Sequence, residues 1–567
     1  MPKPRQVLAL SQLFDRAIAL HQAGQLAEAE RTYQQLLNAK SDHVEALHLF
    51  GILRFQQGRT HEALDLIAEA LKTKPSYVEA HYNRGNILAQ LDLYEEAIAS
   101  YDKALAVIPE YPEAHLNRGN SLSALMRYEE ALASYDNAIA SGHDYADALD
   151  CRGTALRHLN RFDEALASYD RALAINPRNA TVHNNRGNAL RMLMRHEQAL
   201  RCFDEALAIE PNFVDPLLNR GFALLELLRF GEALASYAKA QTIQPDYAEA
   251  HLNEADCRLL IGDFERGWEK FEWRWKTAQW RRFKRNFAQP FWLGKEDIIG
   301  KTILIYAEAG FGDTLQFCRY VRLVSERGAT AILEVQPPLK RLLSTLDGAQ
   351  TVLARGEPLP HFDFHCPLLS LMRVFNTRLD SIPRGTPYLR APTDRIAHWQ
   401  VRLPQTGSLR VGLVWSTSSA SKWGGGNKWL RFKQLAPLLS VDCASFVSLH
   451  RERDLSPEDA SAVAGSGRIV DFGSEQPDFI DAAAMISSLD LVISVDSALG
   501  HLAGALGVPV WIMLPFSAEW RWLLERDDSP WYPTARLFRQ PQLNDWESVL
   551  AQVARELVQL NKTRSLP

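Results

Sequence analysis

Residues 302–314 read Thr-Ile-Leu-Ile-Tyr-Ala-Glu-Ala-Gly-Phe-Gly-Asp-Thr and predict a strand, a glycine turn and a helix start. The apolar run 302–306 is typical of a buried strand. Gly310 and Gly312 let the backbone come close to a ligand, and Asp313 can accept hydrogen bonds from free amides at the helix start. Asp313 is therefore either a helix cap or a residue that takes part in chemistry.

From residue 301 onward, short apolar runs alternate with amphipathic helix patterns, and this alternation predicts parallel sheets. The expected strands form two series, at 302–306, 330–335, 351–354 and 361–365, and then at 409–415, 445–449, 468–472, 489–495 and 508–514. Two doubly wound modules hold ligands at the carboxyl ends of their strands, in the cleft between the modules. We expect the last helix, 546–560, to pack across that cleft.

The first half of the chain is an array of 34-residue repeats, marked by Gly51, Gly85, Gly119, Gly153, Gly187 and Gly221. An aromatic residue stands 16 positions after five of these glycines, at Tyr101, Tyr135, Tyr169, Phe203 and Tyr237. Small residues let two antiparallel helices approach, and the aromatic ring fills the space beside them. The pattern resembles the tetratricopeptide repeat over roughly residues 8–275 and predicts an α-solenoid with a concave surface.

An Asn-Arg pair precedes four of the repeat glycines, on the helix expected to line the concave surface. Its asparagines are Asn83, Asn117, Asn185 and Asn219. A ladder of asparagine amides can hydrogen-bond the backbone of an extended peptide whatever its side chains, so these residues are candidates for binding a protein acceptor. The alternative is that they form hydrogen bonds within the array or are solvated.

Composition and charge describe an ordinary globular protein, with 46% apolar and 23% charged residues. The formal net charge of −5 gives no footprint for nucleic acid. The 6 cysteines lie far apart without metal-ligand spacing, which argues against a zinc site or a disulfide framework and favours a reducing compartment. The N-terminus lacks a signal-peptide pattern and the apolar stretch 502–514 is too short to span a bilayer, so we expect a cytoplasmic protein.

Residues 276–299 are rich in basic and aromatic side chains, centred on Trp280-Arg-Arg-Phe-Lys-Arg285. Such interleaving occurs in proteins that bind single-stranded nucleic acid. Because the run is short, we prefer a packed elbow between the array and the sheets.

The segment Ser494-Val-Asp-Ser-Ala-Leu-Gly-His501 combines a strand end with a helix start. The free amides and the dipole of such a helix favour a diphosphate ligand. Asp496, Ser497 and His501 are therefore candidates for a phosphate site, and a simple helix cap is the alternative.

A second candidate loop, 416–428, follows the strand that ends at Trp415. A lysine at this edge of the sheet can neutralise a diphosphate leaving group, a task that a metal performs elsewhere, and no Asp-x-Asp pair at a strand end offers a magnesium site. Lys428 is preferred to Lys422 because it lies just before the next expected helix, and a solvated loop is the alternative. The ligand-binding candidates from this edge are Trp415, Ser416, Thr417, Lys422, Lys428 and His450.

Residues 300–545 resemble the heptosyltransferase-like glycosyltransferases of the GT-B fold, in the form fused to tetratricopeptide repeats. The matching pieces are 300–305, 309–320, 411–415, 490–504, 520–523 and 529–533. The resemblance implies a repeat superhelix (1–275), an elbow (276–299), an acceptor-side Rossmann-like module (300–390), a nucleotide-sugar module (391–545), and a C-terminal helix and tail (546–567).

The resemblance further implies an inverting transfer from a nucleotide-diphosphate sugar, without a metal or another cofactor. The family's proposed general base falls on Asp313, with Gly310 and Gly312 beside it in the donor site. Its phosphate-contacting cation falls on Lys428, and its helix-start residues are those at 496, 497 and 501. Glu308 is the nearby carboxylate that could replace Asp313 as the base.

The sequence thus predicts a hexosyl- or heptosyl-type glycosyltransferase whose acceptor is a protein recruited by the repeats. Two alternatives stay open: a scaffold that binds a nucleotide sugar without turnover, and a transferase that acts on lipopolysaccharide or another glycan. The identities of the sugar, the nucleotide and the acceptor, and the oligomeric state, do not follow from the sequence.

Overall fold

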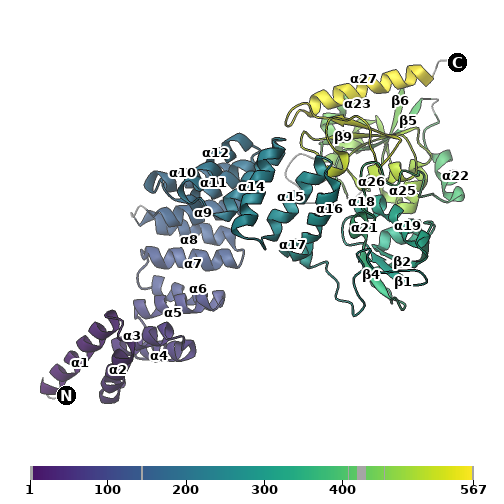
Figure 1. Ribbon diagram of the computed structural model, residues 1–567. Helices are drawn as coiled ribbons and strands as arrows, with labels where there is room; N and C mark the ends of the chain where they lie inside the picture. Colours follow the sequence, from purple (N-terminus) through teal and green to yellow (C-terminus); the bar gives the residue numbers. More distant parts are fainter. Residues whose placement is uncertain (1–3, 142–144, 406–407, 418–428, 452–453, 565–567) are drawn as a thin grey trace. The chain divides into compact units, whose positions relative to one another are not determined.

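A computed structural model describes residues 4–141, 145–405, 408–417, 429–451 and 454–564 (Figure 1). The chain divides into two units, 1–213 and 214–567. No helix within the described ranges has both the length and the apolar character that a membrane span requires.

The first unit is a stack of antiparallel helix pairs (Figure 1). Its helices are α1 (Pro4–Gln22), α2 (Leu26–Ala39), α3 (Val44–Gln56), α4 (Thr60–Thr73), α5 (Val78–Gln90), α6 (Tyr94–Leu105), α7 (Pro112–Ala124), α8 (Tyr128–Ala140), α9 (Ala146–His158), α10 (Phe162–Ile175), α11 (Ala180–Met192) and α12 (His196–Ile209). The second unit opens with further pairs, α13 (Val214–Glu226) with α14 (Phe230–Ile243), and α15 (Ala248–Leu260) with α16 (Phe264–Phe271). The predicted α-solenoid is confirmed.

Each repeat glycine from Gly85 onward faces the aromatic ring of the next helix. A Cβ added at Gly85 would lie 2.5 Å from the ring of Tyr101, and one at Gly119 would lie 2.4 Å from the ring of Tyr135. Real Cβ atoms do not approach other atoms so closely, so the glycine is what lets the two helices of a pair pack around a buried aromatic side chain. This close approach explains the 34-residue period of the sequence.

The turn inside each helix pair contains one residue with a left-handed backbone. Glycine fills this position in the outer repeats, at Gly24, Gly58 and Gly262. The inner repeats place other residues there, with φ between 58° and 60°: Asp92, Met126, Asn160, Met194 and Leu228. These side chains add strain that glycine avoids.

The first α/β module contains a parallel sheet of β1 (Thr302–Tyr306), β2 (Thr330–Val335), β3 (Ala349–Ala354) and β4 (Phe364–Pro367), in the order β3-β2-β1-β4. The helical segments after its first strand are α18 (Phe311–Phe317), η2 (Cys318–Tyr320) and α19 (Val321–Glu326), and those after its last strand are η4 (Leu368–Ser370) and α21 (Leu371–Val374). The two expected strands that open this series are confirmed at 302–306 and 330–335.

The second module contains a parallel sheet in the order β10-β9-β8-β5-β6-β7. Its strands are β5 (Leu409–Val414), β6 (Ala444–Ser448), β7 (Ile469–Asp471), β8 (Leu491–Val495), β9 (Val510–Leu514) and β10 (Ala535–Arg539). The helix α26 (Ala498–Ala505) follows β8, and the short turn η8 (Trp520–Trp522) follows β9. The sequence analysis missed β10, although its predicted class of parallel α/β modules is confirmed.

In both sheets the strand order reverses beside the first strand, because β1 lies between β2 and β4 and β5 lies between β6 and β8. Ligands of open α/β sheets bind at such switch points, outside the carboxyl ends of the strands. The segments at these ends are the glycine turn after β1, the loop after β5 and the helix start after β8.

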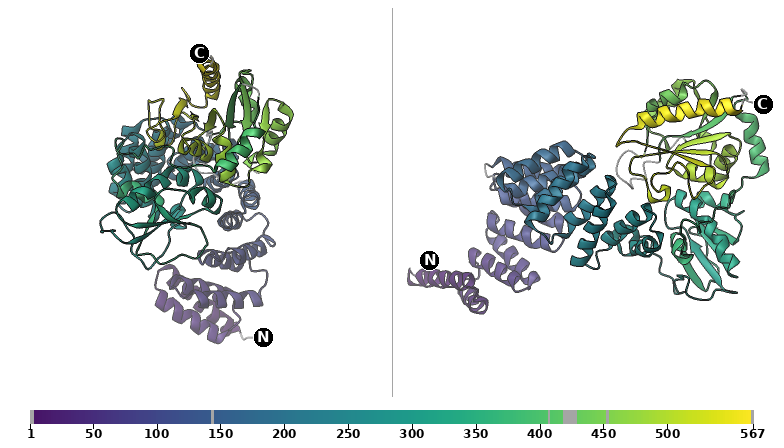
Figure 2. Two further views of the ribbon diagram at one scale, coloured as in Figure 1. Left: turned by 90° about the vertical axis from the view of Figure 1, so that its right-hand side faces the viewer. Right: turned by 45° about the horizontal axis from the view of Figure 1, so that its top comes forward.

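The C-terminal helix α27 (Trp546–Arg564) lies along the second module (Figure 2). Its buried residues Val549, Leu550, Val553 and Leu557 join the cluster that holds Val411 and the rest of the apolar face of the second sheet. The expectation that this helix crosses the cleft is therefore wrong, because its apolar stripe is covered within one module.

The elbow predicted at 276–299 begins inside the turn η1 (Glu272–Lys276) and continues through α17 (Ala278–Arg281). Its Trp292 is fully buried, and the backbone amide of this residue donates to the His365 carbonyl at 2.9 Å. The segment is thus attached to the edge of the first sheet beside β4.

Candidate functional site

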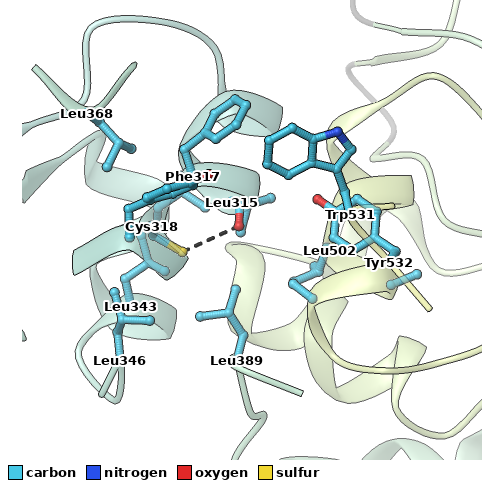
Figure 3. Packing of buried hydrophobic residues seen from close by; sticks show 14 of the residues in the cluster. Leu315, Phe317, Cys318, Leu343, Leu346, Leu368, Leu389, Leu502, Trp531 and Tyr532 are labelled. Carbon is cyan, nitrogen blue, oxygen red and sulfur yellow. Dashed lines mark hydrogen bonds between the residues drawn. The ribbon is translucent and has the colours of Figure 1, made fainter. Parts of the chain in front are cut away.

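The helix starts at the two switch points meet, because α18 of the first module packs directly against α26 of the second. Gly312 makes the approach possible, since a Cβ there would lie 2.9 Å from Cδ2 of His501. Beneath this contact, Leu315 and Phe317 of α18 gather with Leu502 of α26, Trp531 and Tyr532 in one buried cluster (Figure 3). The glycine turn after β1 and the helix start after β8 therefore belong to a single site.

Asp313 is the third residue of α18, and its two carboxylate oxygens have different partners. Oδ2 accepts from the backbone amide of Gly310 at 3.0 Å, which caps the helix. Oδ1 accepts from Nη2 of Arg521 at 2.6 Å, and the side chains of Asp313 and Arg521 are 25% and 10% exposed. The carboxylate is thus a cap and also the first module's contact with a cation of the second.

Arg521 is the residue that sequence reasoning missed. It lies in η8, pairs with Glu519 as well as with Asp313, and its buried Nε has no hydrogen-bond partner within the described part of the chain. Burial acts to lower the pKa of Arg521, but the carboxylates of Glu519, Asp313 and Asp496 raise it above its ordinary value. A basic residue between two tryptophans after a strand end was the available signal.

His501 is fixed from three sides. Its Nδ1 lies 2.9 Å from the Tyr532 hydroxyl, its ring stacks on Trp522 at 5.4 Å between centroids, and its Nε2 lies 3.6 Å from Oδ1 of Asp496. Gly504 makes room for this arrangement, because a Cβ there would lie 2.4 Å from the Tyr532 ring. The histidine is 3% exposed, so it shapes the site and does not project from it.

Ser497 caps α26, and its Oγ accepts from the Gly500 amide at 3.1 Å. The same hydroxyl lies 2.7 Å from Oγ of Ser494. The first amides of an α-helix have no partner inside the helix. The cap therefore orients a helix start that can receive an anion next to Asp496, whose side chain is 10% exposed.

The ligand-binding residues predicted after β5 and β6 differ in their burial. Trp415 is fully buried, with Nε1 3.4 Å from Oδ2 of Asp459, and His450 is 3% exposed, with Nε2 accepting from the Trp415 amide at 3.2 Å. Burial lowers the pKa of His450 to about 4 although Asp454 raises it. Both side chains are therefore packed in the core near the carboxyl ends of β5 and β6, and their contact with a ligand stays a prediction.

Ser416 and Thr417, in contrast, are partly exposed at the carboxyl end of β5. The predicted phosphate contacts Lys422 and Lys428 lie outside the described residues.

Glu308 is not an accessible substitute for Asp313, because it is 2% exposed. Its Oε1 accepts from Nη2 of Arg274 at 3.1 Å and from the Leu369 amide at 3.2 Å. Burial raises the pKa of Glu308 to about 7, against the opposing effect of Arg274. The residue anchors the turn that precedes Asp313.

The asparagines of the array make hydrogen bonds to the preceding repeat. The side-chain amide of Asn83 lies 2.9 Å from Nε2 of His48, that of Asn117 donates to Oη of Tyr82 at 3.1 Å, and that of Asn185 donates to Oδ1 of Asp150 at 2.9 Å. Asn219 also has a partner. These contacts agree with the alternative of bonding within the array, and binding of a peptide backbone by the asparagines stays a prediction.

Across the residues that the structure describes, no group of three or more His, Cys, Asp or Glu side chains is arranged to hold a metal ion. The groups of the site that are suited to an anion are the start of α26 and the guanidinium of Arg521.

Sequence families match both halves of the chain. The tetratricopeptide repeat family matches residues 48–115, 94–150 and 180–213, and the related TPR repeat family matches 153–193. Glycosyltransferase family 9 (heptosyltransferase) matches 477–513, which includes β8 and α26. The chain joins tetratricopeptide repeats to a heptosyltransferase-like domain.

Protein FlbA of Caulobacter vibrioides is 26% identical over 327 residues, which make up 53% of this chain and 54% of that protein. The chain therefore spans about half the length of this curated relative. Among solved structures, YrrB, titled a TPR protein with an unusual peptide-binding site, is 26% identical with a TM-score of 0.29, over 32% of this chain and 95% of that one. A tetratricopeptide repeat protein from Parabacteroides merdae is 18% identical with a TM-score of 0.36, over 44% of this chain and 98% of that one.

Proposed function

We propose that the chain is an inverting glycosyltransferase that moves a sugar from a nucleotide-diphosphate sugar to a protein recruited by the repeats. The proposal rests above all on one observation, the contact of Arg521 with Asp313 beside the start of α26. This contact joins a carboxylate at the switch point of the first sheet to a cation that follows β9 of the second sheet. Glycosyltransferase family 9 matches residues 477–513 of that second module.

Each group has a task in such a transfer. Asp313 accepts the proton of the acceptor hydroxyl while the acceptor oxygen bonds to the anomeric carbon. The bond from that carbon to the phosphate oxygen breaks, and the nucleoside diphosphate leaves with the electron pair. The α26 amides, Arg521 and Lys428 stabilise the charge of the leaving group, so the reaction needs no metal or other cofactor.

A reducing compartment suits this protein, because all of its cysteines are free: Cys151, Cys202, Cys257, Cys318, Cys366 and Cys443. We therefore place the reaction in the cytoplasm, with the donor supplied from the soluble nucleotide-sugar pool.

The proposal is tested with a panel of UDP-, GDP- and ADP-sugars in the presence of EDTA. We expect one donor to be hydrolysed slowly without an acceptor, and its nucleoside diphosphate to raise the melting temperature by mass action. If no donor is turned over and no nucleoside diphosphate shifts the melting temperature, the chain is not a nucleotide-sugar transferase. If a diphosphate binds without any turnover, the chain is a nucleotide-sugar-binding scaffold.

A further inference from the structure

The last repeat is built into the site as well as into the array. Its residues Leu259, Phe264, Trp268 and Phe271 belong to the same buried cluster as Phe317 of the first module and Trp520 of the second. The helix α15 also packs against η8. This part of the chain makes two contacts beside the pair formed by Asp313 and Arg521. One contact is next to Arg521, and the other is at the turn before Asp313.

The first contact is made by Trp268, which is 2% exposed. Its ring meets the ring of Trp520 at 5.2 Å between centroids and at 84°, while its Nε1 donates to the Thr377 carbonyl at 2.8 Å. Trp520 also stacks on Phe317, at the end of α18, at 6.0 Å. Because Arg521 is the next residue after Trp520, Trp268 holds the backbone from which the guanidinium reaches Asp313.

The second contact is made by Arg274, which is fully buried. Its Nη2 donates to Oε1 of Glu308 at 3.1 Å and to Oγ of Ser370 at 2.8 Å, and its guanidinium lies over the ring of Trp275 at 4.5 Å. Glu308 opens the turn that carries Asp313. Arg274 also pairs with Glu272 at 2.8 Å. A buried arginine with this many partners keeps Glu308 in one place, and removing Arg274 leaves this buried carboxylate without its cation.

We infer that Trp268 and Arg274 of the last repeat are positioning residues for sugar transfer, which hold Arg521 and the turn before Asp313 in register. The inference rests on the proposed function and extends it. The array then does more than recruit an acceptor, because its last helix pair and the turn η1 that follows it set the geometry of the base and the cation. Close-packed interiors transmit small displacements, and a misplacement of about 1 Å at a reacting group costs on the order of a hundredfold in rate.

Donor hydrolysis without an acceptor separates this role from acceptor recruitment. We expect Trp268→Ala to lower kcat roughly tenfold to a hundredfold while KM and the affinity for the nucleoside diphosphate change less than about threefold. Trp268→Phe keeps a ring against Trp520 and restores most of kcat. Arg274→Lys keeps the positive charge but cannot bond Glu308, Ser370 and Glu272 at the same time, as the guanidinium does. We expect the same loss in kcat from this variant, with an intact fold.

The matched control is Phe203→Ala, which removes a buried repeat aromatic in the first unit and leaves hydrolysis at the wild-type rate. Wild-type kcat in Arg274→Lys, together with a loss in Trp268→Ala no larger than in Phe203→Ala, overturns the inference. Amide hydrogen exchange of 307–313 and 518–523 distinguishes this result from failure of the proposed function, because it needs no turnover. Faster exchange in Trp268→Ala than in Phe203→Ala supports the coupling, and equal exchange overturns it.

Discussion

Arg521 donates a 2.6 Å hydrogen bond to Asp313, and this contact links η8 of the second module to the first turn of α18 in the first. The other oxygen of the carboxylate is held by the Gly310 amide at 3.0 Å, so the group has one orientation. Glu519 shares the guanidinium. A structural change in either module therefore alters the position of the carboxylate of Asp313, the proposed base.

Replacing Asp313 by asparagine separates its two roles. The side-chain oxygen of the introduced amide can still cap α18, but the group no longer accepts a proton, so we expect donor turnover to fall by about 10²–10⁴-fold. Binding of the nucleoside diphosphate stays at least as tight, because a negative charge beside the phosphate site is lost. Steady-state hydrolysis and calorimetric titration of Asp313→Asn measure the two effects.

The control for that substitution is Asp528→Asn, which removes a more exposed carboxylate paired with Arg526. It leaves turnover unchanged. Full turnover in Asp313→Asn shows that the base assignment is wrong.

Arg521→Gln tests the cation. A hydrogen bond to a charged group contributes about 1.5–3 kcal/mol, so we expect the affinity for the nucleoside diphosphate to fall on the order of tenfold or more. Arg536→Gln is the matched control, because Arg536 of β10 pairs instead with Glu556 of α27. If calorimetry gives the same affinity for Arg521→Gln and the wild type, the phosphate contact belongs to the lysines of 416–428.

Deleting N-terminal repeats distinguishes recruitment of the protein acceptor from the chemical step at the donor. Deleting 1–213 removes the first unit and leaves the cluster that α15 and α16 share with both modules, so we expect donor hydrolysis within about threefold of the wild type and no transfer to a protein acceptor. Deleting 1–275 instead uncovers Trp520 and the neighbouring core, and we expect an aggregating, inactive protein. Unchanged protein transfer after the shorter deletion contradicts recruitment by the first unit.

The parts of this protein that followed from the sequence are those fixed by local spacing. The repeat period follows from the packing of Tyr101 on Gly85, and the first strands of each module follow from uninterrupted apolar runs. The pairing of Arg521 with Asp313 did not follow, because it depends on how two modules dock across 208 residues of chain. The burial of Trp415 did not follow either, because the same residue types line a core and a ligand site.

Met126 offers a test of the strained turns in the array. It has a φ of 59° and a side chain that is 74% exposed, so its side chain adds strain with little compensating burial. We expect Met126→Gly to stabilise the protein by about 1 kcal/mol, measured by denaturant unfolding. Met192→Gly, at the last residue of α11, removes a similar side chain from a helical position and is expected to destabilise. Destabilisation by Met126→Gly contradicts the strain argument.

His196 makes the array sensitive to acid. The residue is 5% exposed, and neither ring nitrogen has a hydrogen-bond partner among the residues that the structure describes. One repeat away in either direction, the same position holds Phe162 and Phe230. Burial, with help from Arg191, lowers the pKa of His196 from 6.5 to about 4. The unfolded chain therefore takes up a proton that the folded chain resists, and stability is lost as the pH falls from about 6.5 towards 4.

We accordingly expect His196→Phe to stabilise the protein by about 1–3 kcal/mol near pH 7.5, because two unsatisfied nitrogens are removed. The gain grows at pH 5, because the proton-linked loss disappears with the imidazole. Melting temperatures of the variant and the wild type at the two pH values measure the stabilisation and its increase at pH 5. His61→Gln, at an exposed position of α4, serves as the control and changes neither. A gain of equal size at pH 5 and pH 7.5 shows that the acid sensitivity does not arise from His196.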